Sequence, residues 1–147
     1  MPLVINKRAK FDYQISKTYH AGIVLTGPEV KSLRNKHASL RGSFIKILDG
    51  EAFLINAQIN PYKFADNTDY DPKRSRKLLL KKKEIQQLIG LSDQKGWTIV
   101  PLSFELKRNV IKLNFGVGKG KKEYEKREKI KKRDIKRQIA KQMKSSY

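Results

Sequence analysis

The excess of positive charge is the feature that most restricts how this chain can fold. Its 147 residues include 34 Lys and Arg against 14 Asp and Glu, a formal net charge of +20 at pH 7. A compact state has to tolerate the repulsion among these charges, and a polyanionic partner relieves it. Nucleic acid is the usual such partner, because each neutralised phosphate releases counterions. The charge therefore predicts nucleic-acid binding, with a merely well-solvated surface or an anionic membrane surface as the alternatives.

The charge is concentrated toward the C-terminus. Residues 1–117 hold 21 basic and 10 acidic side chains, whereas residues 118–147 hold 13 basic and 4 acidic ones. The second segment is also poor in apolar residues, so it cannot bury a core of its own. We therefore expect one folded domain over 1–117 and a basic C-terminal tail over 118–147. The glycines of Gly116-Val-Gly118-Lys-Gly120 favour a break in regular structure between them.

The tail has a helical pattern that depends on a partner. Acidic residues precede basic ones at i,i+4, as in Glu123 with Arg127 and Glu125 with Lys129. Each such pair contributes only about 0.2–0.5 kcal/mol, and the many cations oppose it. We expect a tail that is disordered when free and helical when bound to phosphate. The alternative is a charged segment that serves only solubility.

The first 117 residues read mainly as β-strands joined by local turns. Asp49-Gly50 separates the strands expected at 43–48 and 51–55, and this pair is typical of a type I′ hairpin. Residues 21–26, 97–106 and 110–117 are expected as further strands. Thr26 followed by Pro28 and Glu29 predicts a helix to about His37. A long polar loop is expected up to Pro72.

A second helix is expected to end near Gly90, which would act as its left-handed terminator, with Leu80, Leu88 and Ile89 turned inward. Short strands with two to three short helices predict a mainly β fold, a small antiparallel OB-type barrel. We expect a monomer, since no feature indicates an obligate oligomer.

The sequence offers little that catalysis could use. It has no cysteine, so disulfides, thiol nucleophiles and Cys-ligated zinc are excluded. His20 and His37 fit no metal-ligand spacing, and Gly118 to Lys122 lacks the spacing of a phosphate loop. Three loop acids could approach a metal, Asp66, Asp69 and Asp71. We expect a binding protein that needs no catalytic residue, cofactor or metal.

No apolar run reaches the roughly 20 residues that span a bilayer, and the N-terminus lacks a secretory apolar region. We expect a cytoplasmic protein with no membrane partner.

Basic clusters with nearby aromatic side chains indicate RNA. The clusters are Asn6-Lys-Arg-Ala-Lys10, Lys31 with Arg34 and Lys36, and Lys73-Arg-Ser-Arg-Lys77. Phe11, Tyr13, Tyr19 and Tyr62 lie nearby, and such rings can stack on splayed bases, although Tyr13 is expected in the core.

In their order along the chain, several segments closely resemble the small protein B (SmpB) family, the tmRNA-binding proteins of bacterial trans-translation. These segments are Asn6-Lys-Arg-Ala9, Ala21-Gly-Ile-Val-Leu25, Glu29-Val-Lys-Ser-Leu-Arg34, Gly50-Glu-Ala-Phe-Leu54, Asp71-Pro-Lys-Arg-Ser-Arg-Lys-Leu-Leu-Leu80, Gly96-Trp-Thr-Ile-Val-Pro101, and Gly118-Lys-Gly-Lys-Lys122 with Lys126-Arg127.

The resemblance implies an OB-type barrel that binds the tRNA-like domain of tmRNA. It also implies delivery of alanyl-tmRNA, with elongation factor Tu, to stalled ribosomes (ribosome rescue). The tail would become helical in the empty mRNA channel, beside the 16S rRNA of the decoding centre.

The family's functional positions map onto two sets of residues in this chain. The RNA-binding set is Asn6, Lys7, Arg8, His20, Lys31, Arg34, Arg76, Lys77 and Leu78. The ribosomal set in the tail is Lys119, Lys121, Lys122, Tyr124, Glu125, Lys126 and Arg127. The chain departs from the family pattern at Phe11, often histidine, at His20, often acidic, and at Glu125, often aspartate.

Two other functions stay open at this point. One is a general OB-type RNA chaperone or ribosome-associated protein. The other is an RNA-processing enzyme, which would need Asp66, Asp69 and Asp71 to converge on a metal.

Overall fold

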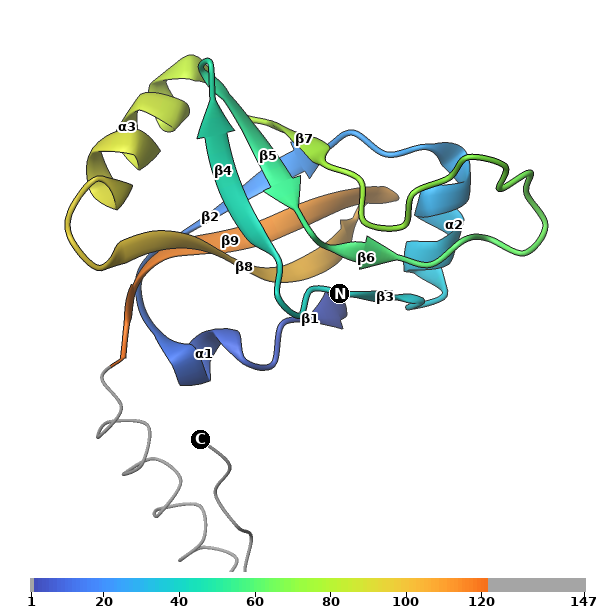
Figure 1. Cartoon of the computed structure of the whole chain (residues 1–147), viewed down its shortest axis with the longest axis horizontal. Helices are drawn as coiled ribbons and strands as arrows, with labels where there is room; N and C mark the ends of the chain where they lie inside the picture. The colour runs from blue at the N-terminus through green and yellow to red at the C-terminus, as the bar shows by residue number, and fades with distance from the viewer. Residues whose placement is uncertain (1, 122–147) are drawn as a thin grey trace, which may run out of the picture.

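Residues 2–121 are described by the computed structural model in Figure 1. The strands are β1 (Pro2–Ile5), β2 (Tyr13–Ile23), β3 (Ala38–Ser39), β4 (Phe44–Leu48), β5 (Glu51–Ile55), β6 (Gln58–Ile59), β7 (Arg76–Leu79), β8 (Trp97–Lys107) and β9 (Val110–Gly120). The helices are α1 (Ala9–Asp12), α2 (Gly27–Arg34) and α3 (Lys82–Ser92).

Seven strands form one antiparallel sheet in the order β1-β8-β9-β2-β7-β5-β4. The sheet curls so that its edge strand β4 contacts β8, and β3 pairs with β6 in a separate small ladder (Figure 1). The predicted mainly β, antiparallel fold with short helices is thus confirmed, and the curled sheet is consistent with the OB-type barrel that was expected.

The curled sheet encloses the core. Fully buried side chains come from β5, α2, β8 and β9, among them Leu54, Leu33, Phe104, Leu113 and Phe115. Burying apolar area of this kind contributes about 25 cal/mol per Å².

Both two-residue hairpin turns use positive φ angles at both central positions. Asp49 and Gly50 join β4 to β5 with φ of 50° and 76°, as predicted. Arg108 and Asn109 do the same between β8 and β9, with φ of 48° and 65°. These angles match the right-handed twist of the flanking strands.

Helix α2 begins as its sequence predicts. The Thr26 hydroxyl accepts from the Glu29 backbone N–H, and the Glu29 carboxylate accepts from the Thr26 N–H, which completes a capping box. The helix ends at Arg34, before the predicted limit near His37, where the chain turns through Lys36 at φ 62°.

Two predictions about the secondary structure are wrong. Strand β2 covers 13–23 instead of 21–26, and its first half was missed because Lys17 interrupts the alternation of apolar and polar residues at the point where the strand carries a bulge. Gly90 lies inside α3 and terminates nothing. In that helix Leu88 and Ile85 are buried, whereas Ile89 is 45% exposed.

The predicted break at Gly116 to Gly120 is also wrong, since β9 continues to Gly120. A Cβ on Gly116 would lie 2.7 Å from Ile15 Cγ2, and one on Gly118 would lie 2.8 Å from Ile15 Cδ1. These glycines therefore allow β2 to approach β9 closely, and the domain limit expected after Val117 falls inside a strand.

A buried ionic network ties α2 to β7. Glu29 is 1% exposed and its carboxylate accepts hydrogen bonds from both Arg74 and Arg76, with Arg76 Nη2 2.7 Å from Oε2. Arg76 is 0% exposed and also donates to the carbonyl oxygens of Ala57 and Pro72. Every buried side-chain polar atom in the described residues has a partner.

The network keeps Glu29 ionised. Burial alone would raise its pKa, but hydrogen bonds from Arg74, Thr26 and Arg76, with the positive charge of Arg76, lower the pKa from 4.5 to about 2. Burial and the adjacent carboxylate raise the pKa of Tyr70, whose hydroxyl lies 3.1 Å from Glu29 Oε2. One carboxylate thus organises two guanidinium groups and a phenol.

We predict that Gly118→Ala destabilises the fold by about 1–3 kcal/mol, because the added methyl group overpacks the β2–β9 contact. Gly120→Ala, where a Cβ meets nothing within 4 Å, is the matched control and should change stability by about 0.5 kcal/mol or less. Urea denaturation measures both. A second substitution, Ile15→Val, removes the Cδ1 atom that the new methyl group of Gly118→Ala would contact, so it should partly restore the stability of that variant. It should not restore Gly116→Ala, whose methyl group would contact the Cγ2 atom that valine retains. Equal restoration of both variants would contradict this geometry.

We predict an acid-dependent loss of stability that originates at Glu29. Because its folded pKa is below its unfolded pKa, its contribution of about 3 kcal/mol is complete above pH 4.5 and is lost as pH falls toward 2. Glu29→Gln should destabilise the protein at pH 7 by about 3–5 kcal/mol, since it leaves buried guanidinium charge unpaired. It should also flatten the profile between pH 4.5 and 2.

The control is Glu51→Gln, which breaks the exposed pair with Lys77 at 3.1 Å and should cost about 0–1 kcal/mol. Equal losses in the two variants, measured by denaturation across pH, would refute the special role of Glu29.

Candidate nucleic-acid interface

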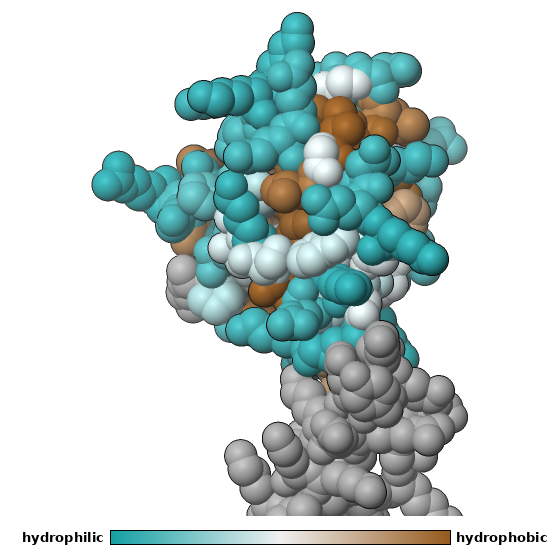
Figure 2. Space-filling model, turned by 90° about the vertical axis from the view of Figure 1, so that its left-hand side faces the viewer, coloured by the Kyte–Doolittle hydropathy of each residue, from teal (hydrophilic) through white to brown (hydrophobic). Residues whose placement is uncertain are grey.

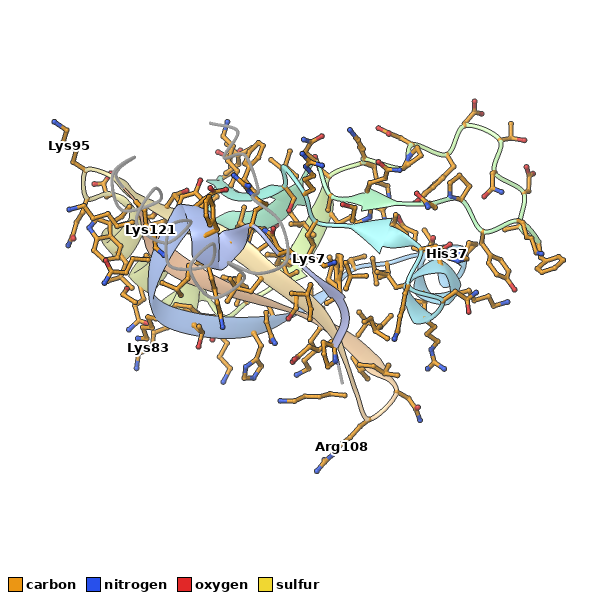
Figure 3. The ribbon with its side chains drawn as sticks, turned by 90° about the horizontal axis from the view of Figure 1, so that it is seen from below. Lys7, His37, Lys83, Lys95, Arg108 and Lys121 are labelled. Atoms are coloured by element: carbon orange, nitrogen blue, oxygen red, sulfur yellow. The ribbon has the colours of Figure 1, made fainter. Side chains whose placement is uncertain are left out.

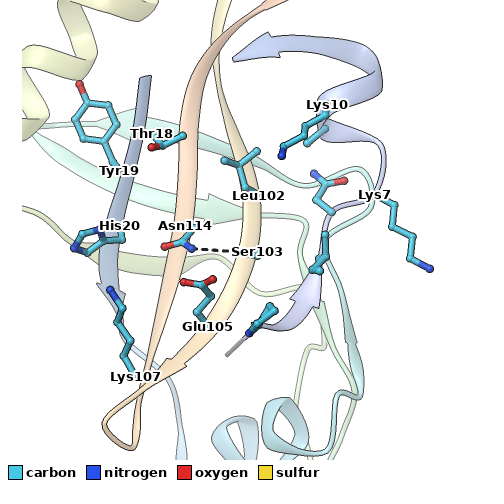
Figure 4. Close-up of a pocket in the computed structure, with 14 residues that line it drawn as sticks. Lys7, Lys10, Thr18, Tyr19, His20, Leu102, Ser103, Glu105, Lys107 and Asn114 are labelled. Atoms are coloured by element: carbon cyan, nitrogen blue, oxygen red, sulfur yellow. Dashed lines mark hydrogen bonds between the residues drawn. The ribbon is translucent and has the colours of Figure 1, made fainter. Parts of the chain in front are cut away.

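Three of the predicted RNA-binding residues surround one hollow of about 550 Å³ on the sheet (Figure 4). Asn6 and Lys7 approach it from the β1–α1 segment and His20 from β2. The same hollow is also lined by Lys10 of α1 and Tyr19 of β2, which the sequence analysis named among its basic clusters and aromatic rings, and by Lys107 of β8, which it did not single out. A concave, basic surface of this size can accept a phosphate backbone with its sugar edge.

Asn6 fixes the rim of this hollow. Its backbone N–H donates to the Leu102 carbonyl oxygen and its Nδ2 to that of Pro101, both at 2.8 Å. The segment that carries Lys7 and Arg8 is thereby attached to β8, and both side chains are exposed. Arg8 lies over the Phe11 ring at 4.6 Å and pairs with Asp12 at 3.4 Å.

His20 lies opposite Asn114 in the β2–β9 ladder, and its side chain is exposed. Asn114 Nδ2 donates to Ser103 Oγ at 3.4 Å across the floor of the hollow (Figure 4). This arrangement presents polar groups, and among residues 2–121 Glu105 is the one acidic residue that lines the hollow. Phe11, the other departure from the family pattern, is buried and belongs to the interior.

Lys31 and Arg34 form a separate basic patch on α2. Both are exposed, and the Lys31 ammonium lies 5.4 Å from the centre of the Tyr62 ring. Figure 3 shows His37, just beyond α2, well to the right of Lys7. Between them, Lys7 and Arg8 line a further hollow together with Lys36 and Arg41, so basic side chains continue from the β1–α1 segment toward the end of α2.

Of the three predicted residues on β7, only Lys77 is exposed. Arg76 is 0% and Leu78 is 2% exposed, so neither side chain can reach RNA in this conformation. Arg76 binds Glu29, and Leu78 joins the core because alternate residues of a strand point to opposite faces. Lys77 faces outward and pairs with Glu51.

The first predicted ribosomal residues are anchored to the domain. Lys119 lies on β9 opposite Gln14. Lys121 N donates to the Asp12 carbonyl oxygen at 2.9 Å, and its Nζ donates to that of Lys10 at 2.8 Å. The described chain thus ends beside α1 (Figure 1). Lys122, Tyr124, Glu125, Lys126 and Arg127 lie outside the described residues.

The three loop acids serve local turns. Asp66 accepts from the backbone N–H and hydroxyl of Thr68, and these bonds lower its pKa. Asp71 accepts from the Lys73 N–H, and Asp69 adopts a φ of 59°. Within residues 2–121 no three His, Cys, Asp or Glu side chains gather closely enough to hold a metal ion.

None of the helices in the described part of the chain has the length and apolar character required to cross a membrane.

The signal that the sequence analysis missed is the first half of β2. Tyr13, Ile15, Tyr19 and Ala21 keep the period of two that is typical of a strand, and Lys17 is the polar residue that interrupts it. If this single interruption is accepted, Tyr19 and His20 are placed on one strand with Tyr13 and Ile15.

Comparisons with known proteins agree with this architecture. The family model described as SmpB protein matches residues 3–145. An SsrA-binding protein of Lactobacillus delbrueckii subsp. bulgaricus is 51% identical over 137 residues, 93% of this chain and 90% of the relative. That of Bacillus subtilis is 48% identical over 141 residues, 96% of this chain and 90% of the relative.

A solved structure described as "tmRNA-SmpB: a journey to the center of the bacterial ribosome" contains a chain that is 46% identical in sequence and superposes with a TM-score of 0.70. The match covers 93% of this chain and 96% of that chain. Since the family model and these relatives extend over nearly the whole sequence, the chain belongs to the SmpB family.

Proposed function

We propose that this protein binds tmRNA (SsrA RNA) and acts with it on the ribosome in trans-translation. The observation that carries the proposal is the near full-length match to SsrA-binding proteins, with a structural neighbour from a tmRNA–SmpB ribosome complex. The exposed basic surfaces of the domain fit an RNA partner, because they gather cationic side chains such as Lys7 and Lys107 around one hollow of the sheet. With these partners, its place of action is the bacterial cytoplasm.

The domain contributes the first part of this function. The hollow with Asn6, Lys7 and His20, the nearby Arg8, the α2 patch of Lys31 and Arg34, and Lys77 together bind the tRNA-like domain of tmRNA. Arg76 and Leu78 contribute indirectly, since they fix β7 in the fold. The protein acts as an adaptor without chemical turnover, and it delivers alanyl-tmRNA together with elongation factor Tu.

The tail contributes the second part. It begins where β9 ends, and the bonds from Lys121 to α1 set the point at which it leaves the domain. Its basic residues contact 16S rRNA in the empty mRNA channel and at the decoding centre. Two linked modules then read two RNAs, so that affinity is highest where both sites can be occupied at once.

We predict that the Lys7→Ala, Arg34→Ala double variant binds the tRNA-like domain of tmRNA about tenfold more weakly, a loss of about 1.4 kcal/mol. Its plot of log affinity against log salt should be shallower by about 2, since two phosphate contacts are lost. Filter binding over a salt series measures both quantities.

The matched control removes the same charge at Lys83 and Lys95, which lie at the opposite end from His37 (Figure 3). A control variant that loses as much affinity as the double variant would mean that charge acts without regard to position. The protein would then be a general RNA chaperone, and wild type should bind the tRNA-like domain and an ordinary tRNA equally.

We predict that deletion of residues 122–147 leaves the affinity for the tRNA-like domain within about threefold of wild type and abolishes peptide tagging on stalled ribosomes. The deletion starts after Lys121 because β9 and its bonds to α1 extend that far. Reconstituted tagging and RNA binding are measured on the same preparation. Loss of RNA binding in the deletion would contradict the division of labour between domain and tail.

A further inference from the structure

The loop between β6 and β7 carries the most exposed large apolar side chain in the described part of the protein. Phe64 is 75% exposed, and its neighbours over residues 60–69 are exposed or half-buried. An exposed aromatic ring contributes little to the stability of its own fold, since its apolar area stays in water. Its place on the surface therefore points to an external partner.

Phe64 belongs to a cluster of rings and ammonium groups. The ring centroids of Tyr62 and Phe64 are 5.5 Å apart at an interplanar angle of 67°. Lys63 Nζ lies 4.8 Å from the centroid of Phe64, and Lys31 Nζ lies 5.4 Å from that of Tyr62. We call Tyr62, Lys63 and Phe64 the aromatic tip.

The aromatic tip is held in place by its own loop. Asn67 Nδ2 donates to the carbonyl oxygens of Tyr62 and Ala65, at 2.9 and 3.1 Å, and the Ala65 N–H also donates to Tyr62 at 3.0 Å. Further down, the Tyr70 hydroxyl lies within hydrogen-bonding distance of the Ile59 carbonyl oxygen and of Glu29. A partner that binds Phe64 therefore has little loop entropy to remove.

The charges around the tip favour an anionic partner with flat apolar groups. Lys31 and Lys63 lie against the rings, and Arg34 is exposed on the same helix as Lys31. The loop acids Asp66, Asp69 and Asp71 keep their negative charge, but hydrogen bonds from Thr68 and Lys73 hold Asp66 and Asp71 in local turns of the loop. The cations that contact the rings are Lys31 and Lys63. A base that stacks on an open ring face brings its phosphate toward such ammonium groups.

We propose that the aromatic tip is a stacking site for an unpaired RNA base, with Phe64 as the stacking platform and Lys31 and Lys63 as phosphate contacts. It is separate from the hollow that contains Asn6, Lys7 and His20. The views agree that α2, which adjoins the tip through Lys31, lies at the opposite end of the domain from Lys121 (Figures 1 and 3). The base comes from tmRNA or from ribosomal RNA, both of which present unpaired bases. The choice of RNA as the partner rests on the proposed function.

The opposite end of the domain has a surface of a different kind. Figure 2 shows the opposite, left-hand face, where apolar residues are set among hydrophilic ones. There the exposed Ile89 lines a hollow with Leu79 and Lys77. At the aromatic tip, by contrast, the exposed ring projects from the loop with cations beside it, a shape that suits intercalation between or stacking on bases.

The experiment compares Phe64→Ala, Phe64→Leu and Phe64→Trp in the full chain. Two probes are used separately, the isolated tRNA-like domain of tmRNA and the small ribosomal subunit. With the RNA that supplies the base, we expect Phe64→Ala to bind about five- to tenfold more weakly and Phe64→Trp to bind as well as wild type or better. Phe64→Leu should resemble Phe64→Ala, because stacking needs the ring, and the salt slope should not change in any of the three.

Ultraviolet cross-linking provides the second measurement. A cross-link from Phe64 to an unpaired nucleotide, located by mass spectrometry, would identify which RNA supplies the base. Thermal melts of the three variants should match wild type, so a loss of affinity cannot be ascribed to unfolding.

Two outcomes would overturn the proposal. Wild-type affinity of Phe64→Ala for both probes would remove the stacking site. A weaker Phe64→Ala rescued equally by Phe64→Leu and Phe64→Trp would assign the tip to an apolar contact with protein. In either case a retained preference for the tRNA-like domain over an ordinary tRNA leaves the proposed function standing.

Discussion

The packing of α2, β7 and the loop between β6 and β7 depends on the Glu29 carboxylate. This carboxylate completes the cap of α2, binds the guanidinium groups of Arg74 and Arg76, and lies within reach of the Tyr70 hydroxyl. A buried charge of this kind is stable only when fully paired, so helix, strand and loop have to assemble together. The same bonds that lower the pKa of Glu29 therefore hold the base of the loop that carries the aromatic tip.

A second constraint acts at the other end of the sheet. The absence of side chains at Gly116 and Gly118 lets β9 approach the bulged part of β2, and β9 then continues to Gly120. From there Lys121 bonds to the carbonyl oxygens of Asp12 and Lys10. Close backbone packing thus decides where the sheet ends and the basic C-terminal segment begins.

The fold decides which of the basic residues behind the net charge of +20 face solvent and which form ion pairs inside the protein. Basic side chains that face outward, such as Lys7 and Arg34, are available for phosphate. Arg76 has the same charge, but it is buried and forms an ion pair with Glu29. Arg74 also forms an ion pair with Glu29. Counting basic residues in a motif therefore overestimates the number that can contact RNA.

Local chemistry in the sequence determined much of this protein. The Asp49-Gly50 turn, the Thr26–Glu29 capping box, the later strands and the mainly β class follow from short-range backbone preferences, and all are present. The ordered family motifs identified the chain's relatives. Of the predicted RNA-binding residues, all but Arg76 and Leu78 are at least partly exposed, and their contacts with RNA remain predictions.

Only the tertiary structure decided the features that depend on residues far apart in the chain. Gly118 continues strand β9 because Ile15 and Gln14 of β2 pack against it. These residues are about a hundred positions away in the sequence, so no local pattern around Gly118 reveals the contact. Arg76 and Lys77 are adjacent and equally basic, yet one is buried on Glu29 and the other faces solvent. Strand alternation and a partner 47 residues away separate their roles, and these are set by packing rather than by residue type.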